Sequence, residues 1–170
     1  MSGQMKKGGL IAAAAALSCA GVPAQAAMQC WNPTQVAAAK VRDLQSRLMV
    51  ATLRCQAMGV DVSAAYNRFV GANRARIQGA NAVLLAQFRS GYGGQAQTYY
   101  DRFATALANF YGADATDQDV CADTGALAEE AAAAAGDIRL LVAIEDRYGF
   151  SSSLPGGECG YDFASAAGGD

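Results

Sequence analysis

The sequence predicts an all-α protein, folded as an antiparallel up-and-down bundle of about four helices. Alanine supplies much of the apolar content, aromatic residues make up only 8% of the chain, and there are only 3 prolines. Because alanine is the strongest helix former and proline the strongest helix breaker, this composition favours helix. The sequence has no run of β-branched or aromatic residues in alternation, which is the pattern that would indicate strands.

Residues 1–26 have the features of a secretory signal peptide. Lys6 and Lys7 precede an apolar run, and the segment 24–26, Ala-Gln-Ala, is a small-x-small cleavage site. The apolar run is about a dozen residues long, shorter than the ~20 that cross a bilayer, so no stable transmembrane span is expected after cleavage. An N-terminal anchor helix and a lipid anchor on Cys19 are the alternatives to simple secretion.

The expected organisation is a signal peptide over 1–26, a helical bundle domain over 27–150 and a Gly/Ser-rich irregular tail over 151–170. The predicted location is the periplasm or the outside of the cell. Four cysteines follow the signal peptide, and an even number of cysteines in an exported domain predicts disulfides.

The first expected helix runs from Asn32 to Gly59, and the rest of the chain is organised around it. Asn32 is a typical N-cap, Pro33 suits the first helical position, and Gln35 can complete a capping box. Gly59 supplies the left-handed residue that ends a helix. One apolar stripe needs partner helices to bury it, and it consists of Val41, Leu44, Leu48, Ala51, Cys55 and Met58. The charged residues are expected elsewhere on the helix surface, namely Lys40, Arg42, Asp43, Arg47 and Arg54.

The second expected helix covers about 64–89 and the third about 95–111. Asn73 falls in the apolar register of the second helix. It therefore either lies at the edge of the apolar stripe or is buried, where an unpaired amide costs about 1–3 kcal/mol. Gly71 and Gly79 inside this helix indicate a close helix–helix approach or a bend.

The last expected helix covers about 116–148 and ends at Gly149. Thr116 is its expected N-cap, and the acidic residues that follow suit the positive end of the helix dipole. A break or kink is expected near 123–125, where Gly125 interrupts the pattern.

The bundle topology predicts how the cysteines pair. The first helix carries the chain from Cys30 to Cys55, and at ~1.5 Å per residue these two lie far beyond disulfide reach of each other. The last helix begins near Cys121 at the upper end of the bundle, and the tail brings Cys159 back to the lower end. We therefore expect the disulfides Cys55–Cys121 and Cys30–Cys159, each worth about 3–5 kcal/mol.

Most kinds of catalytic and metal site are disfavoured by the residue types present. The sequence has no histidine, which removes Ser-His and Cys-His nucleophilic pairs and His-ligated metals. The acidic segment 114–123 lacks the glycine and terminal glutamate of a calcium loop, so its aspartates are expected to cap a helix. Glu129 and Glu130 are adjacent and point about 100° apart on a helix, so they form no facing acid/base pair. No metal or cofactor is expected.

The charge distribution leaves two interpretations open. Basic residues dominate between Lys40 and Arg102, and acidic residues dominate from Asp114 onward. This asymmetry fits either a basic surface for an anionic partner or simple packing of the basic half beside the acidic half. The net charge of -2 argues against nucleic acid as a partner.

Two groups of side chains are candidates for a binding site. A ligand or partner surface on the second helix would consist of Asn73, Arg74, Arg76 and Asn81. Arg74 and Arg76 are two residues apart and so face different directions, which weakens this patch. Aromatic residues could line an apolar ligand site, although packing in the core explains them equally simply: Trp31, Tyr66, Tyr92, Tyr99, Tyr100 and Tyr111.

Three segments resemble a known group of proteins: Ala38–Gln56, Ala65–Arg74 and Tyr100–Gly112. They are similar in order and spacing to an uncharacterised family of small exported proteins of alphaproteobacteria, especially sphingomonads, which share the Cys-Trp start at Cys30. The resemblance spans roughly Cys30 to Cys121. It implies an envelope location and no activity, and no functional residue is carried over from it.

The sequence therefore favours a non-enzymatic periplasmic or secreted bundle that acts through contacts with a protein partner in the cell envelope, in a structural or adaptor role. A module that binds a small apolar or anionic ligand between its helices is the alternative, and a carboxylate-dependent hydrolase ranks third. A pocket lined by tyrosine and arginine would favour the binding module. Two carboxylates facing each other across a cleft would favour the hydrolase.

Overall fold

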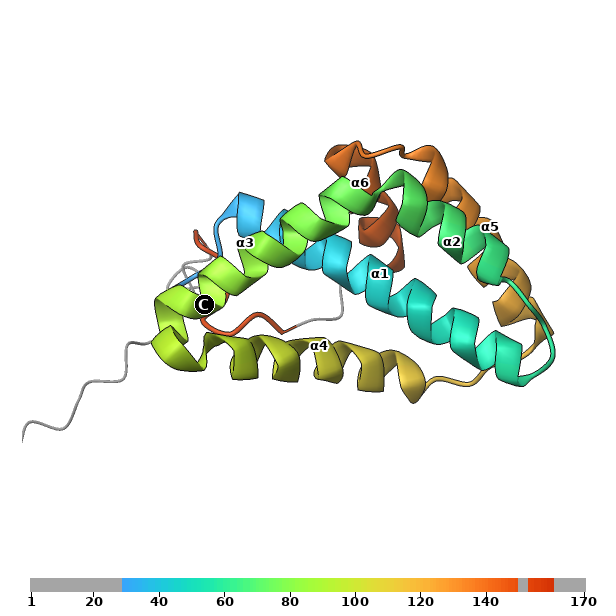
Figure 1. Ribbon diagram of the computed structural model, residues 1–170, viewed down its shortest axis with the longest axis horizontal. Helices are drawn as coiled ribbons and strands as arrows, with labels where there is room; N and C mark the ends of the chain where they lie inside the picture. Colours follow the sequence, from blue (N-terminus) through green and yellow to red (C-terminus); the bar gives the residue numbers. More distant parts are fainter. Residues whose placement is uncertain (1–28, 150–152, 161–170) are drawn as a thin grey trace, which may run out of the picture.

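The computed structural model describes residues 29–149 and 153–160, and this part of the chain is all-α, as predicted (Figure 1). Its helices are α1 (Pro33–Ala57), α2 (Ser63–Ala72), α3 (Arg74–Tyr92), the short 3-10 turn η1 (Gly93–Gln95), α4 (Ala96–Gly112), α5 (Gln118–Ala133) and α6 (Ile138–Tyr148). The predicted signal peptide and the end of the tail lie outside the described residues. Among the described helices, none combines the length and apolar character that crossing a membrane requires.

Helix α1 is central to the packing and contacts every other α-helix of the described chain. Figure 1 shows α4 along one side of it and α2 and α3 on the other. The predicted capping box is present, because Asn32 Oδ1 accepts from Gln35 N at 3.0 Å and Gln35 Oε1 accepts from Asn32 N at 2.8 Å. Gly59 adopts the left-handed conformation beyond the helix, with φ of 83°. Leu44 and Leu48 of the apolar stripe are fully buried.

The prediction of one continuous second helix is wrong at Asn73, where the chain divides into α2 and α3. This residue is 1% exposed, and its side chain makes three hydrogen bonds. Its amide nitrogen donates to Phe69 O at 3.0 Å and Ala131 O at 2.9 Å, and its amide oxygen accepts from Gly136 N at 2.8 Å. The buried amide thus joins the α2–α3 break to the end of α5, and these bonds accompany the loss of helical continuity.

The last predicted helix is also divided, but not where it was expected. Its N-cap is Asp117 rather than Thr116, and Gly125 lies inside α5. A Cβ on Gly125 would meet a Val62 side-chain atom at 3.5 Å, an ordinary van der Waals contact, so Gly125 faces the residue that precedes α2. The break lies instead at Ala135 and Gly136, which have φ of 46° and 84°.

Beyond this break the chain reverses, so that α5 and α6 form a helical hairpin. The Asp137 side chain caps α6 by accepting from Arg139 N at 2.9 Å. Glu130 in the last turn of α5 pairs with Arg147 near the end of α6. A single last helix running the length of the bundle is therefore the part of the predicted topology that the structure corrects.

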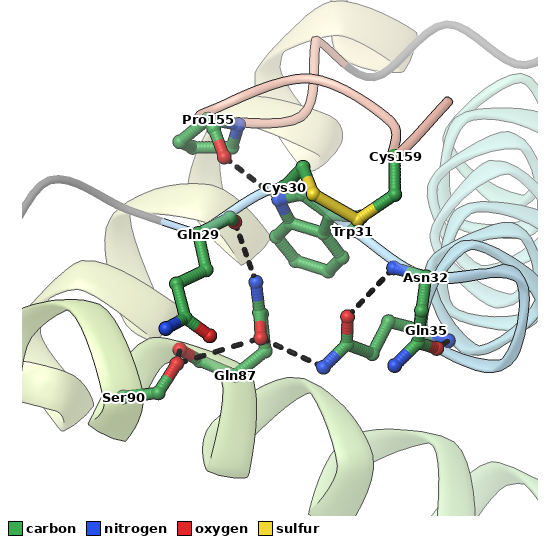
Figure 2. Close-up of a disulfide and its surroundings, with 9 residues drawn as sticks. All are labelled: Gln29, Cys30, Trp31, Asn32, Gln35, Gln87, Ser90, Pro155 and Cys159. Carbon is green, nitrogen blue, oxygen red and sulfur yellow. Dashed lines mark hydrogen bonds between the residues drawn. A yellow bond between two sulfur atoms is a disulfide. The ribbon is translucent and has the colours of Figure 1, made fainter. Parts of the chain in front are cut away.

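The tail returns to the beginning of α1 and is fastened there by the terminal disulfide, Cys30–Cys159, with a Cα–Cα distance of 4.9 Å (Figure 2). Trp31 is fully buried beneath this segment and donates from Nε1 to Pro155 O at 2.7 Å. On the backbone, Trp31 N donates to Gly157 O at 2.8 Å, and Cys159 N donates to Trp31 O at 2.9 Å. The described tail therefore holds the only tryptophan of the chain in place.

Aromatic and amide side chains of α3 and α4 complete the surroundings of Trp31. Its ring lies edge-on to Phe88, with ring centroids 5.8 Å apart, and it stacks on Phe103 at 6.3 Å. The buried Gln87 amide donates to Gln29 O at 2.8 Å and accepts from Gln35 Nε2 at 2.7 Å, as Figure 2 shows. This end of the bundle is thus joined by apolar packing, hydrogen bonds and a disulfide together.

The interhelical disulfide, Cys55–Cys121, joins the end of α1 to the start of α5, with a Cα–Cα distance of 5.5 Å. Both of its cysteines are fully buried, whereas Cys30 and Cys159 are exposed. The structure thus contains both disulfides that the topology predicts. The pairing holds although the last helix reverses, because Cys121 precedes the reversal and the tail continues to the other end of the molecule.

Candidate functional site

A cavity of about 190 Å³ lies between α1, the α4–α5 loop and α5, and Tyr148 at the end of α6 contributes to its lining. We call it the Arg47 cavity. Its apolar lining includes Leu48, Ala51 and Leu127. Its polar lining includes two arginines and two tyrosines, namely Arg47, Arg54, Tyr111 and Tyr148. Thr116, Thr124 and the exposed carboxylates of Asp114 and Asp123 complete the polar lining.

Arg47 of α1 connects the cavity to the end of α6. Its side chain is 20% exposed, and its Nη2 donates to Glu145 Oε1 at 2.9 Å and to Gly149 O at 3.1 Å. The guanidinium carbon lies 4.7 Å from the ring centroid of Tyr111 and 5.5 Å from that of Tyr148. Contacts of this kind between a cation and aromatic faces are favourable, and they fix the orientation of the guanidinium.

Two carboxyl side chains lie in the core next to this arginine. Asp43 of α1 and Glu145 of α6 are both 0% exposed, and the Tyr111 hydroxyl donates to Asp43 Oδ1 at 2.5 Å. Glu145 Oε2 is buried and has no hydrogen-bond partner among the described residues. We call Asp43, Arg47 and Glu145 the buried charge cluster.

The surroundings of Glu145 favour its protonated form. Burial raises the pKa of Glu145 from 4.5 to about 7; the nearby Arg47 opposes this rise and the Asp43 carboxylate adds to it. The physical reason is that the carboxylate loses its hydration in the core and lies near the Asp43 carboxylate, while the Arg47 guanidinium compensates only in part.

Arg54 supplies a second cation to the cavity lining. Its guanidinium donates to the backbone carbonyl groups of Tyr111, Gly112 and Asp114, at the end of α4. Carbonyl groups at a helix C-terminus lack partners within the helix, and a basic side chain satisfies them well. No ion pair of the described chain includes Arg54.

The structure separates the four residues of the predicted ligand or partner surface. Asn73 is buried at the α2–α3 junction, Arg74 is exposed, and Arg76 donates to the carbonyl of Gly136. The half-buried Asn81 accepts from the Tyr100 hydroxyl at 3.0 Å. Because Asn73 is inside the fold, these residues do not share one surface. Over residues 29–149 and 153–160, no group of three or more Cys, Asp or Glu residues is placed to hold a metal ion.

Sequence reasoning assigned Asp43 and Arg47 to the helix surface and did not single out Glu145. Asp43 is fully buried, so its surface assignment is wrong. One available signal was spacing, since Glu145 follows the buried Leu141 by four residues and so shares its face of α6. Asp43 and Arg47 are likewise four apart on α1, but the partners that bury them come from α4 and α6.

No protein-family model, no curated protein and no solved structure matches this chain. The resemblance to exported alphaproteobacterial proteins therefore stays a prediction from the sequence. What the site can do follows from its own geometry. A concave, largely apolar cavity with a fixed cation and two aromatic rings is suited to a small molecule that carries one polar group.

Proposed function

We propose that this protein is an exported binding module that takes a small ligand into the Arg47 cavity. The observation that carries the proposal is the convergence of Arg47, Tyr111 and Tyr148 on a cavity whose walls include Leu48 and Leu127. Ligand sites are typically concave and mostly apolar, with a few polar groups that fix the orientation of the ligand. Here the cation is already oriented by its ring contacts and by Glu145.

Export is part of the proposal, with the periplasm or the outside of the cell as the location. Both disulfides support it, because disulfides form and persist mainly in oxidising compartments. The signal-peptide pattern at 1–26 points the same way.

We do not propose hydrolysis. The third interpretation of the sequence requires two carboxylates that face each other across a cleft. Asp43 and Glu145 are both buried, and neither contributes to the lining of the Arg47 cavity, whose carboxylates are the exposed ones of Asp114 and Asp123. A general acid or base must come within hydrogen-bond reach of the substrate atom that it serves, so the two buried carboxyl groups do not support hydrolysis in this cavity. A role in protein contacts within the envelope stays a prediction, and it is compatible with ligand binding.

The test is a ligand-detected NMR screen of the full oxidised chain against a defined library of small carboxylates, alcohols and amines. Ala51 lies in the cavity lining, so Ala51→Phe should fill the space and remove the saturation-transfer signals. Ala106 is exposed on α4 and outside the lining, so Ala106→Phe is the matched control and should keep the signals. The proposal fails if no compound binds the natural chain, or if Ala51→Phe binds as well as the control.

A further inference from the structure

We propose that the ligand of the Arg47 cavity is a small carboxylate, and that it binds together with a proton taken up by Glu145. This inference rests on the proposed binding function. It adds the chemical class of the ligand and a dependence of binding on pH.

The guanidinium of Arg47 is the group that recognises the ligand. Within the described chain its ion-pair partner is Glu145, and its Nε is buried without a hydrogen-bond partner. Arginine binds carboxylates through two parallel N–H···O bonds in a fixed planar geometry. A carboxylate in the cavity would therefore compete with Glu145 for the same cation, while the rings of Tyr111 and Tyr148 keep the guanidinium in place.

The apolar part of the ligand follows from the rest of the lining. Leu48, Ala51 and Leu127 offer apolar surface next to the cation, which suits a small hydrocarbon or aromatic body. Asp114 and Asp123 also contribute to the lining, but both are exposed, so water and salt screen their repulsion of an anion.

The proton is needed because the charged groups around Glu145 do not compensate a further negative charge. From α1, Asp43 and Arg47 face it, and from α4, Tyr111 donates its hydroxyl proton to Asp43. On α6 itself, Asp146 adds a further negative charge, although it pairs with Lys40.

The remaining neighbouring helix does not supply a compensating cation. From α5, Glu130 approaches α6, but it is exposed and paired with Arg147. A bound carboxylate would therefore place an additional anion beside the partly buried guanidinium of Arg47. Repulsion of this kind raises the affinity of the neighbouring carboxylate for a proton.

The exchange balances in charge. The ligand carboxylate takes the place of Glu145 on Arg47, and one proton from water neutralises the Glu145 carboxylate, whose Oε2 has no hydrogen-bond donor in the described structure. Burial already raises the pKa of Glu145 to about 7, so this proton is exchangeable close to neutral pH. Binding should be about tenfold weaker at pH 8 than at pH 6, because at pH 8 the proton must be supplied on binding.

The experiment uses benzoate as the probe and titration calorimetry on the full oxidised chain. Each titration is run at pH 6 and pH 8, in two buffers of different ionisation enthalpy, which reveals the number of protons taken up. We expect the tenfold loss of affinity at pH 8, with uptake of about one proton per benzoate there and almost none at pH 6. Benzyl alcohol, which has a similar shape and no charge, should bind more weakly than benzoate at pH 6.

Two variants locate the effect. Glu145→Gln should bind benzoate with the same affinity at both pH values and without proton uptake. Glu129→Gln changes an exposed acid that pairs with Arg68, so it should behave like the natural chain. If Glu145→Gln fails to fold, the proton count of the natural chain decides the question.

The outcomes separate this inference from the function on which it rests. Equal benzoate affinity at both pH values with no proton uptake, or benzyl alcohol binding as tightly as benzoate, overturns the inference and leaves a ligand-binding cavity. The absence of binding by benzoate, benzyl alcohol and every compound of the NMR library overturns both.

Discussion

Replacing Glu145 by glutamine should change how the stability of the protein depends on pH. In the folded protein burial raises the pKa of Glu145 from 4.5 to about 7. The unfolded chain therefore releases this proton at lower pH than the folded protein does. Between these pKa values the folded state holds more protons, so the free energy of unfolding must fall as the pH rises.

The size of this effect follows from the shift. Each pKa unit corresponds to about 1.4 kcal/mol. A group that moves from 4.5 to about 7 therefore lowers the free energy of unfolding by up to about 3 kcal/mol between pH 4.5 and pH 8. The amide of Glu145→Gln has nearly the same shape and does not titrate. The difference in stability between the variant and the natural protein should thus move in favour of the variant by up to about 3 kcal/mol over that range.

Urea unfolding with the disulfides intact measures this difference, with the fluorescence of Trp31 as the probe. Glu129→Gln is the matched control. Its hydrogen bond with Arg68 holds the pKa of Glu129 below the usual value, so Glu129 titrates at more acidic pH than Glu145 in the folded protein. That variant should run parallel to the natural protein from pH 5 to pH 8. If Glu145→Gln also runs parallel over this range, the reasoning about a buried, protonated carboxyl group is refuted.

Three further predictions concern the fold. Asn73→Ala should lower the free energy of unfolding by about 2–4 kcal/mol, because the carbonyl of Ala131 and the amide of Gly136 lose their buried partner; a loss below 1 kcal/mol in urea unfolding would contradict this. Gly136→Ala should lower the free energy of unfolding by about 1–2 kcal/mol, because φ is 84° at this position. Gly79→Ala, in open space on α3, should raise it by about 0.5–1 kcal/mol. Equal effects of the two substitutions would show that backbone conformation is not the cause. The exposed terminal disulfide should be reduced by dithiothreitol before the buried interhelical one, with a change in Trp31 fluorescence; alkylation and mass spectrometry would show the opposite order if burial does not control access.

The features that depend on residues close together in the sequence could be predicted from it. The start of α1 follows from Asn32, Pro33 and Gln35, and its end follows from Gly59, because caps are local chemistry. The disulfide pairing needed only the end of the bundle at which each cysteine lies. An approximate topology was therefore enough to predict the pairing, even though the last predicted helix is divided into α5 and α6 in the structure.

The positions of the two helix breaks could not be predicted, because the hydrogen bonds of Asn73 join one break to the other. The segment around Ala131 and Ala135 is rich in the best helix former, so local propensity predicts an unbroken helix. The break there is held by Asn73, which is 58 residues from Ala131 and 63 from Gly136 in the sequence. Hydrogen bonds over such separations appear only after the helices have packed.

The candidate site was hidden for a similar reason. Charged residues on a helix are usually exposed, and this rule placed Asp43 and Arg47 on the surface. The burial of Asp43 and the partial burial of Arg47 depend on the Tyr111 hydroxyl from α4 and the Glu145 carboxyl from α6, the latter 98 residues beyond Arg47. The patch on the second helix was visible in the sequence, yet Asn73 serves the fold there and not a surface.

The proposed binding function gives the buried charge cluster a role that folding stability alone does not require. Replacing a buried ion pair by apolar residues of similar volume is often neutral or stabilising by about 1–4 kcal/mol, so a helical bundle does not need one for folding. The raised pKa of Glu145 also lowers the free energy of unfolding as the pH rises. Two disulfides that close long loops offset such costs by destabilising the unfolded chain. They therefore allow the core beside the Arg47 cavity to carry the polar groups that the proposed carboxylate ligand and its proton would require.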